Sequence, residues 1–351
     1  MQIINFEYEK NYIMDFLNFP KKIYSKKYLT EDRKTMKQFL LNKHILSKYF
    51  KMYKYLIYDN KISARFCLIE YPNDDNIYIG FFECINDSKV AKYLFEQIQK
   101  LAKKFNKNKI IGPVDGSFFH KYRLKINNFN IPYTGEPYNK DYYFKLFKDN
   151  NYHIFEHYVS NYYQELSNDY ENKLFISHYN EFINKGYKIE SLKMDEFSNI
   201  IEEVYYLLTS LYAHFPIYKS ITKDDFINLF MSLKQIINPN LVKLAFYKDK
   251  LVGFLICFPN YNNLVYQLNI INILKILRIK NNPKEIVAPY LGVDYNHKGL
   301  GKALVWSLAL ELKKHHIPCI SALIHDGNIN IDYAKELKTN VNEYVLLERQ
   351  I

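Results

Sequence analysis

The sequence has few of the residues that cross-link a chain or bind a structural metal ion. Its 351 residues include 4 Cys, 1 Trp, 10 Gly and 11 Pro. The cysteines lie far apart and form neither a CxxC pair nor a Cys/His cluster; they are Cys67, Cys84, Cys257 and Cys319. We therefore predict reduced thiols, no disulfide framework and no metal site.

Long hydrophobic runs are also missing. No stretch reaches the roughly 20 uncharged apolar residues that a membrane-spanning helix needs. The start, MQIINFEYEKNY, lacks the pattern of a secretory signal. With 48% hydrophobic and 24% charged residues, the composition is that of a globular protein with a sizeable core. We expect a cytoplasmic protein of two domains, since one domain usually has about 100–200 residues.

Positive charge is abundant and unevenly distributed. The net charge is +11, and residues 1–160 hold 27 Lys and Arg against 17 Asp and Glu, which is nearly all of this excess. A basic surface attracts acidic partners such as nucleic acid, an acyl carrier protein or a membrane surface. No five basic residues cluster as in a binding tail, which favours an ordinary solvated surface. We predict no DNA binding and keep an acyl carrier protein as a candidate acidic partner.

The second half of the chain alternates strand and helix patterns. Apolar runs on both sides of Lys248–Lys250 predict a hairpin, and the spacing of Leu304, Val305, Leu308 and Leu312 predicts a helix. The predicted strands are 241–247, 251–258, 286–293, 319–324 and 343–347. The predicted helices are 194–211, 223–237, 302–315 and 331–337.

The first half repeats this order. The predicted strands are 55–58, 63–69, 77–84, 109–111 and 152–162, and the predicted helices are 88–105 and 140–148. Alternating elements of this kind form a mixed sheet flanked by helices. The sequence therefore predicts an α/β (α+β) protein of two similar domains, residues 1–165 and 166–351.

One segment has a recognisable chemistry, the loop between the strand that ends at Val293 and the following helix. Its sequence, DYNHKGLGK, places Gly299 and Gly301 at the start of the helix. Such a loop exposes successive backbone N–H groups at a helix N-terminus, which favour a bound phosphate. Glycine leaves room for the ligand and permits positive φ angles. Lys298 and Lys302 add positive charge beside the anion.

Two familiar phosphate-binding motifs do not fit this loop. No Gly-Lys-Ser/Thr closes it, as a Walker P-loop requires. The third glycine of the dinucleotide fingerprint is missing, and no acidic residue follows about 20 positions later in a βαβ unit. The remaining alternative is that the glycines serve only a turn and a helix cap.

The segment resembles the acyl-CoA site of the GNAT superfamily of N-acetyltransferases. In that family a strand ending in Leu-x-Val precedes a loop of the type Arg/Gln-x-x-Gly-x-Gly/Ala and then a helix. Here Leu291 and Val293 end the strand, and 296–301 form the loop. The resemblance covers roughly residues 190–349. It implies two tandem GNAT-like domains, each with a mixed, mostly antiparallel sheet flanked by helices.

The resemblance also implies a site for acetyl-CoA or another acyl-CoA as co-substrate. Backbone groups at the strand end would pair with the pantetheine arm, the loop amides would hold the pyrophosphate, and an Asn after the next strand would contact the cofactor. The implied residues are Leu291, Gly292, Val293, Asn296, His297, Lys298, Gly299, Leu300, Gly301, Lys302, Ala303 and Asn328.

The catalytic residues depart from the family pattern. Asn296 replaces the usual Arg or Gln, and Lys335 stands where many members have a tyrosine that protonates the departing thiolate. The nearest tyrosine is Tyr333, so the proton donor stays open. An acceptor amine must lose a proton, and groups near the end of the strand 286–293 are candidates for receiving it. These groups are Tyr290, Asp294 and His325, and the candidate catalytic set is Tyr290, His325 and Tyr333.

The first half resembles a degenerate copy of the same fold. When the helix starts are aligned, Lys89 replaces Gly299 and Ala91 replaces Gly301. A lysine side chain there would crowd the path of the phosphates. We therefore predict that acyl-CoA binds only in the second half.

These patterns predict a CoA-thioester-dependent N-acyltransferase, with N-acetyl transfer as the reaction and a small-molecule amine as the acceptor. One alternative is a non-catalytic acyl-CoA-binding regulator, which Lys335 favours. Another is an aminoacyl-tRNA- or carrier-protein-dependent transferase, which suits the basic first half. Residues 260–282 form an insertion that fits a lid, a docking arm or a helix packed between the halves.

Overall fold

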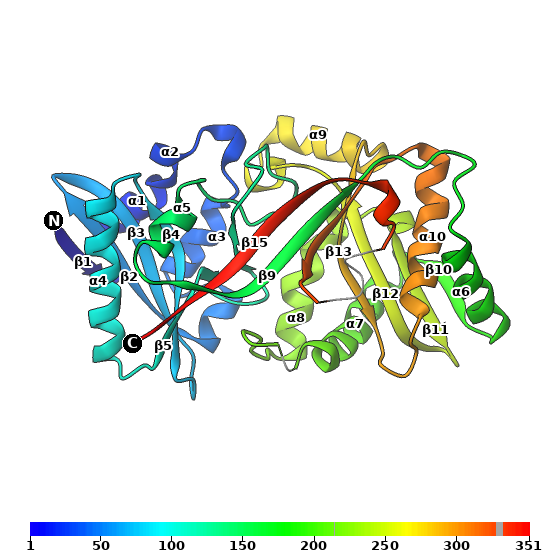
Figure 1. Cartoon of the computed structure of the whole chain (residues 1–351), viewed down its shortest axis with the longest axis horizontal. Helices are drawn as coiled ribbons and strands as arrows, with labels where there is room; N and C mark the ends of the chain where they lie inside the picture. Colours follow the sequence, from blue (N-terminus) through cyan, green and yellow to red (C-terminus); the bar gives the residue numbers. More distant parts are fainter. Residues whose placement is uncertain (214, 328–332) are drawn as a thin grey trace. The chain divides into compact units, whose positions relative to one another are not determined.

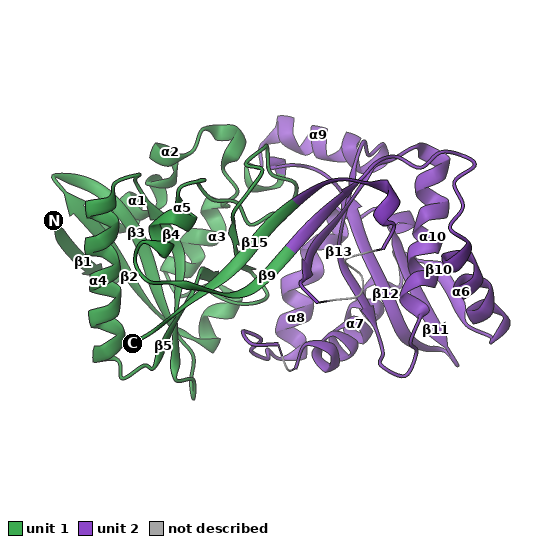
Figure 2. Ribbon diagram, in the orientation of Figure 1, with its two compact units in different colours: residues 1–158, 265–267, 342–351 green, residues 159–264, 268–341 purple. Residues whose placement is uncertain are grey.

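The computed structural model describes residues 1–213, 215–327 and 333–351. These residues form two compact units, each discontinuous in sequence (Figure 2). The first unit consists of residues 1–158, 265–267 and 342–351, and the second of 159–264 and 268–341. The division into 1–165 and 166–351 remains a prediction about the two halves of the chain.

A twisted sheet forms the framework of the first unit (Figure 1). Its strands, in spatial order, are β1 (Gln2–Phe6), β2 (Lys51–Asp59), β3 (Lys61–Glu70), β4 (Asn76–Cys84), β5 (Lys109–Gly112) and β15 (Lys338–Gln350), of which residues 342–350 belong to this unit. Strands β4 and β5 are parallel, and the other neighbours run antiparallel. The C-terminal strand therefore completes the sheet of the first unit, through pairs such as Leu347 with Gly112.

The longest helix of the first unit is α4 (Ser88–Lys104). Asp87 caps it, and Val90, Leu94 and Ile98 are buried against the sheet, as the spacing predicts. Its other helices are α1 (Lys10–Asn18), α2 (Pro20–Ile23), α3 (Arg33–Leu40) and α5 (Tyr143–Lys148). The short strands β6 (Val114–Asp115), β7 (Lys121–Tyr122) and β8 (Leu124–Lys125) lie between β5 and α5 in the chain.

The second unit repeats this plan. Its strands, in spatial order, are β10 (Lys188–Ser191), β11 (Val242–Tyr247), β12 (Lys250–Pro259), β13 (Ile286–Val293), β14 (Cys319–His325) and β9 (His153–Tyr163), of which residues 159–163 belong to this unit. Strands β13 and β14 are parallel, whereas β10 to β13 run antiparallel. The predicted hairpin between β11 and β12 is confirmed. Lys248 and Asp249 both have positive φ angles, as a two-residue type I′ turn requires.

Helix α10 (Leu300–His315) covers one face of this sheet. Its buried residues Leu304, Leu308 and Leu312 belong to the core of the second unit. Helix α6 (Lys173–Asn184), which the sequence patterns did not predict, packs along α10. The remaining helices are α7 (Phe197–Tyr212), α8 (Lys223–Phe230) and α9 (Ile270–Asn281).

The predicted α/β class with mixed, mostly antiparallel sheets flanked by helices is confirmed, but some of the predicted helices are shorter than expected. The helix predicted at 223–237 ends at Phe230, and a 3₁₀ turn follows at Met231–Gln235. In the described part of 331–337 only a 3₁₀ turn forms, at Lys335–Leu337. Strand β15 begins immediately after it, because its pairing extends well before the predicted start at residue 343.

Two further features of the described residues bear on function. None of the helices in residues 1–213, 215–327 and 333–351 is long and apolar enough to cross a membrane. In the same residues, no three His, Cys, Asp or Glu side chains are grouped so that they could hold a metal ion.

Candidate functional site

The pairing of β13 with β14 ends before the predicted acyl-CoA residues. The parallel ladder consists of Ile286 with Cys319, Val287 with Ile320, and Ala288 with Ser321. Beyond Ala288, β13 continues to Val293 and stays paired with β12, for example through Gly253 opposite Val293. The β14 side of the segment 291–293 therefore lies outside the ladder. A ligand with amide groups could pair with strand backbone there.

The loop after β13 is shaped by its own backbone. Asp294 starts a turn in which its carboxylate accepts from the Asn296 N–H at 2.9 Å and its carbonyl from the His297 N–H at 2.9 Å. Gly299 follows with φ of +93°, a left-handed conformation that favours glycine. No side chain caps helix α10. In the described chain, the N–H groups of Gly299 and Gly301 donate no hydrogen bond.

These two open amides form the part of the predicted anion site that the structure supports best. The N–H groups of Asn296 and His297 are used inside the turn, and those of Leu300 and Lys302 point back to the carbonyls of residues 297 and 299. An anion at the start of α10 would therefore rest on Gly299 and Gly301.

The two glycines have different surroundings. A Cβ on Gly299 would lie 3.0 Å from the ring of His178, so this glycine permits both the positive φ and the packing of α6. A Cβ on Gly301 would meet only ordinary contacts, 3.6 Å from Tyr333 Oη, 3.7 Å from Leu291 and 3.8 Å from Val293. Packing therefore explains Gly299 but does not explain Gly301.

The side chain of His297 is held within the protein. Its Nδ1 lies 2.6 Å from the hydroxyl of Tyr187, and its ring also packs against Tyr247. Lys298 is exposed and Lys302 is partly buried at the same end of α10. His297 thus fixes the loop, while the two lysines supply positive charge beside the open amides.

The structure places one predicted catalytic residue next to this loop. The hydroxyl of Tyr333 faces Gly301, Leu291 and Val293, and its ring packs on Phe175 with centroids 5.4 Å apart. Burial raises the pKa of Tyr333, so its hydroxyl keeps its proton at neutral pH. A protonated hydroxyl is the form that a general acid needs.

The other predicted residues are more dispersed. Tyr290 lies on β13 with 37% of its surface exposed. His325 is the last residue of β14, with its ring centroid 5.8 Å from that of Phe215. These residues stand beyond the point where the β13–β14 ladder stops, and their catalytic roles stay predictions. Asn328 lies outside the described residues.

In the first unit, the corresponding backbone donors are already occupied. The Asp87 carboxylate accepts from the N–H groups of Lys89 and Val90 at the start of α4, at 2.8 and 3.3 Å. On β4, the Phe81 N–H donates to the Asp115 carboxylate at 2.6 Å. Negative charge at both places opposes phosphate and thioester oxygens. This arrangement supports the prediction that the first half does not bind acyl-CoA.

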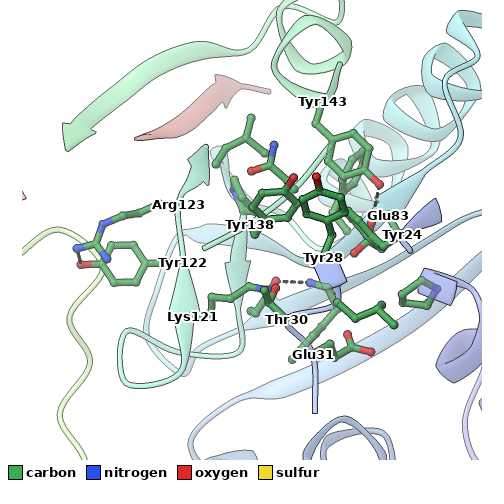
Figure 3. A pocket seen from close by; sticks show the side chains of 18 of the residues that line it. Tyr24, Tyr28, Thr30, Glu31, Glu83, Lys121, Tyr122, Arg123, Tyr138 and Tyr143 are labelled. Carbon is green, nitrogen blue, oxygen red and sulfur yellow. Dashed lines mark hydrogen bonds and ion pairs between the residues drawn. The ribbon is translucent and has the colours of Figure 1, made fainter. Parts of the chain in front are cut away.

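The first unit instead contains a pocket that the sequence patterns did not identify (Figure 3). It is lined by residues from the segments 20–31, 81–83, 113–124 and 138–143, together with Arg65. It includes about 600 Å³ of empty space, part of it open to solvent. Its walls carry five tyrosines, and its polar groups include three carboxylates and three basic side chains.

Glu83 is the most perturbed acid of this pocket. Its carboxylate accepts from the Tyr143 hydroxyl at 2.5 Å and lies 3.9 Å from the Arg65 guanidinium. Burial is the largest effect and raises the pKa of Glu83 to about 7, although Arg65 opposes it. The sequence carries a signal for this pair, since charged Arg65 and Glu83 interrupt apolar strands and face each other in register.

The fold is similar to solved acetyltransferase structures. A tandem GNAT protein from the clavulanic acid biosynthesis pathway, solved without AcCoA, superposes with a TM-score of 0.53 at 8% identity, covering 99% of this chain and 98% of that one. A GCN5-related glucosamine N-acetyltransferase region of a fungal multi-domain GH3 β-N-acetylglucosaminidase gives 0.54 at 10% identity, covering 99% and 38%.

A GCN5-related N-acetyltransferase from Anabaena variabilis gives a TM-score of 0.50 at 9% identity and covers 98% of this chain and 72% of that one. Neither a family model nor a curated protein matches the sequence. At these identities the likeness concerns the fold, and it extends over both units. The chain therefore has the tandem fold of the GCN5-related N-acetyltransferases.

Proposed function

We propose that this protein is an acyl-CoA-dependent N-acyltransferase whose active site lies in the second unit. The observation that supports it most is the pair of open amides at Gly299 and Gly301, placed beside the end of β13. The co-substrate would be acetyl-CoA or another acyl-CoA, and the acceptor a small-molecule amine.

Each part of the site has a role in this reaction. The N–H groups of Gly299 and Gly301 would hold the pyrophosphate, with Lys298 and Lys302 beside it. The backbone of 291–293 would pair with the pantetheine arm and polarise the thioester carbonyl. The acceptor nitrogen attacks that carbonyl carbon, the C–N bond forms and the C–S bond breaks. The ammonium proton leaves to a base, and the thiolate takes up a proton.

Tyr333 is the proposed donor of the proton to the thiolate. We expect Tyr333→Phe to lower kcat by about 100-fold, because general acid catalysis typically contributes 10²- to 10⁴-fold. The KM for acyl-CoA should change little, since the ring stays on Phe175. Free-thiol release from acetyl-CoA with an amine panel measures both. Tyr206→Phe, at an exposed position of α7, is the matched control. An unchanged kcat in Tyr333→Phe would assign the proton donor elsewhere.

A non-catalytic acyl-CoA-binding protein is the second candidate, and Lys335 in place of the usual tyrosine favours it. Such a protein would bind coenzyme A but release no thiol with any amine. An aminoacyl-tRNA-dependent transferase would instead show salt-sensitive tRNA binding without coenzyme A binding.

The surface of α9 supports an acidic partner such as an acyl carrier protein. Between residues 268 and 281 the chain has Lys275, Arg278 and Lys280 but no acidic residue. Large apolar side chains stand exposed beside them, including Ile270 at 79% and Leu274 at 62%. A basic surface with apolar contacts suits a carrier that is acidic and partly apolar.

Charge reversal tests this partner. We expect Lys275→Glu with Arg278→Glu to weaken binding of an acyl carrier protein at least fivefold in a titration at low salt, because like charges repel. The control is Lys103→Glu with Lys104→Glu at the exposed end of α4. Equal losses in both double variants would mean that the whole basic surface, and not α9, attracts the carrier.

A further inference from the structure

Two of the three carboxylates that line the pocket of the first unit have a close basic partner, and Arg123, the third basic side chain, lies over the rings of Tyr122 and Tyr158. Arg65 is held by Glu31 through contacts of 2.5 and 3.3 Å and donates to the Phe16 carbonyl at 2.8 Å. Lys121 lies 3.3 Å from Asp115. Glu83 is 3.9 Å from a guanidinium that Glu31 already neutralises. Among the three carboxylates of the pocket, Glu83 is thus the one without a close counterion of its own.

The hydroxyl beside Glu83 also has unused hydrogen-bonding capacity. Tyr24 is 8% exposed and lines the pocket, and its hydroxyl lies near Glu83 and Tyr143 without a close hydrogen bond in the described chain. The Glu83 carboxylate is near enough to raise the pKa of this tyrosine further, after burial as the main cause. A buried polar atom without a partner is costly, and a ligand group that bonds to it removes that cost.

Aromatic rings form the wall next to these polar groups (Figure 3). Tyr28 and Tyr138 stack with centroids 5.5 Å apart, and Tyr24 packs on Tyr138 at 6.3 Å. The faces of such rings attract ammonium groups. The protein's own lysines already use them in this way, with Lys27 Nζ 4.9 Å from the centre of the Tyr28 ring.

We propose that this pocket is a binding site for a small organic ammonium ion, separate from the acyl-CoA site of the second unit. The ammonium would donate to Oε1 of Glu83 and to the Tyr24 hydroxyl, with its carbon skeleton against the tyrosine rings. The proposal is independent of the acyltransferase function, because no atom of the loop 294–301 takes part.

Binding of a cation to Glu83 depends on pH. The charged and titratable groups that face this carboxylate are Arg65, Glu31, Lys121, Tyr24, Tyr142 and Tyr143. The pKa of Glu83 is raised to about 7, so below that pH the acid is neutral and offers no charge to the ligand. From pH 7.5 to pH 6 the amine affinity should fall roughly eightfold. Binding at pH 6.5 should release a proton.

Calorimetric titration with matched probes tests the site. The probes are phenethylamine, 1-butylamine and 1,5-diaminopentane, with 3-phenylpropionate as the anion of similar shape. We expect at least one amine to bind in the millimolar range or better and 3-phenylpropionate to bind more weakly. Repeating the titration in buffers of different ionisation enthalpy counts the released proton. No amine binding up to 10 mM, or tighter binding of 3-phenylpropionate, would overturn the proposal.

Variants assign the effect to Glu83. Glu83→Gln keeps the shape of the side chain and resembles its neutral form, so the fold should persist. We expect it to weaken amine binding at least tenfold and to abolish the proton release. Glu96→Gln, an exposed carboxylate of α4, is the control and should change neither. Coenzyme A binding should be the same in all three proteins, which separates failure of this site from failure of the acyl-CoA site. Unchanged amine affinity in Glu83→Gln would place the ligand elsewhere.

Discussion

Gly301→Glu should lose coenzyme A affinity by about 100-fold, whereas Gly301→Ala should bind within a few-fold of the natural protein. A Cβ at this position meets nothing closer than 3.6 Å, so alanine fits. A glutamate side chain would place a carboxylate beside the amides proposed to hold the pyrophosphate, as Asp87 does at the start of α4. Isothermal titration with coenzyme A measures the affinities.

Further measurements separate the effects of charge, side-chain size and protein stability on the coenzyme A affinity of these Gly301 variants. Gly301→Gln has the same length without the charge, so its loss should be about tenfold and independent of salt. The loss in Gly301→Glu should shrink as salt is raised, since screening weakens the repulsion. A carboxylate in the first turn of a helix interacts favourably with the helix dipole, so the unfolding temperature of Gly301→Glu should shift little. If Gly301→Ala, Gly301→Gln and Gly301→Glu bind coenzyme A with equal affinity, the pyrophosphate does not lie at Gly301.

The second large effect concerns the buried ion pair of the first unit. Lys125 and Glu136 are 1% and 0% exposed, with Nζ and Oε1 2.5 Å apart. The same carboxylate accepts from Asn342 at 2.8 Å and from Tyr344 at 2.5 Å, which ties the C-terminal strand β15 into this unit. We expect Glu136→Gln to destabilise the first unit by about 3–5 kcal/mol, because it leaves a buried ammonium without its counterion.

The pH dependence of stability and a double variant test whether the unpaired ammonium of Lys125 causes the loss of stability in Glu136→Gln. Burial already lowers the pKa of Lys125, and loss of Glu136 should lower it further. The folded state then prefers the neutral amine, so the stability of Glu136→Gln should rise as pH increases toward 10. Lys125→Met with Glu136→Leu removes both charges and should recover most of the stability. Denaturant unfolding followed by circular dichroism measures this. A loss below 1 kcal/mol in Glu136→Gln would show that water reaches the pair.

Much of the architecture follows from local patterns in the sequence. The strand 286–293 and the helix predicted from Lys302 agree with β13 and α10 within two residues. The apolar spacing of α4 and the hairpin at Lys248 are also local signals. In each case the pattern repeats at the period of a helix or a strand, so no distant contact is needed to recognise it.

Other features depend on contacts between distant parts of the sequence. The pocket brings Tyr24, Arg65, Glu83 and Tyr143 together from four separate elements, and only the pairing of β3 with β4 shows that two of them face each other. Helix α6 was missed, although its Phe175 and Phe182 are buried. The closure of the first sheet by β15 joins residue 347 to residue 112, which no local pattern reveals.

The position of the proton donor shows what a sequence motif alone does not predict. The sequence places Lys335 where a tyrosine is common and leaves the donor open. The structure turns Tyr333 toward Gly301, because its ring packs on Phe175 of the unpredicted helix α6. The position of Tyr333 beside Gly301 thus depends on tertiary packing.

A structure of the protein with coenzyme A bound is the most direct test of the acyl-CoA site. We predict pyrophosphate oxygens within about 3 Å of the Gly299 and Gly301 nitrogens, and a pantetheine arm along residues 291–293. Pyrophosphate at the start of α4, or away from both helices, would contradict the assignment of the second unit as the acyl-CoA-binding half.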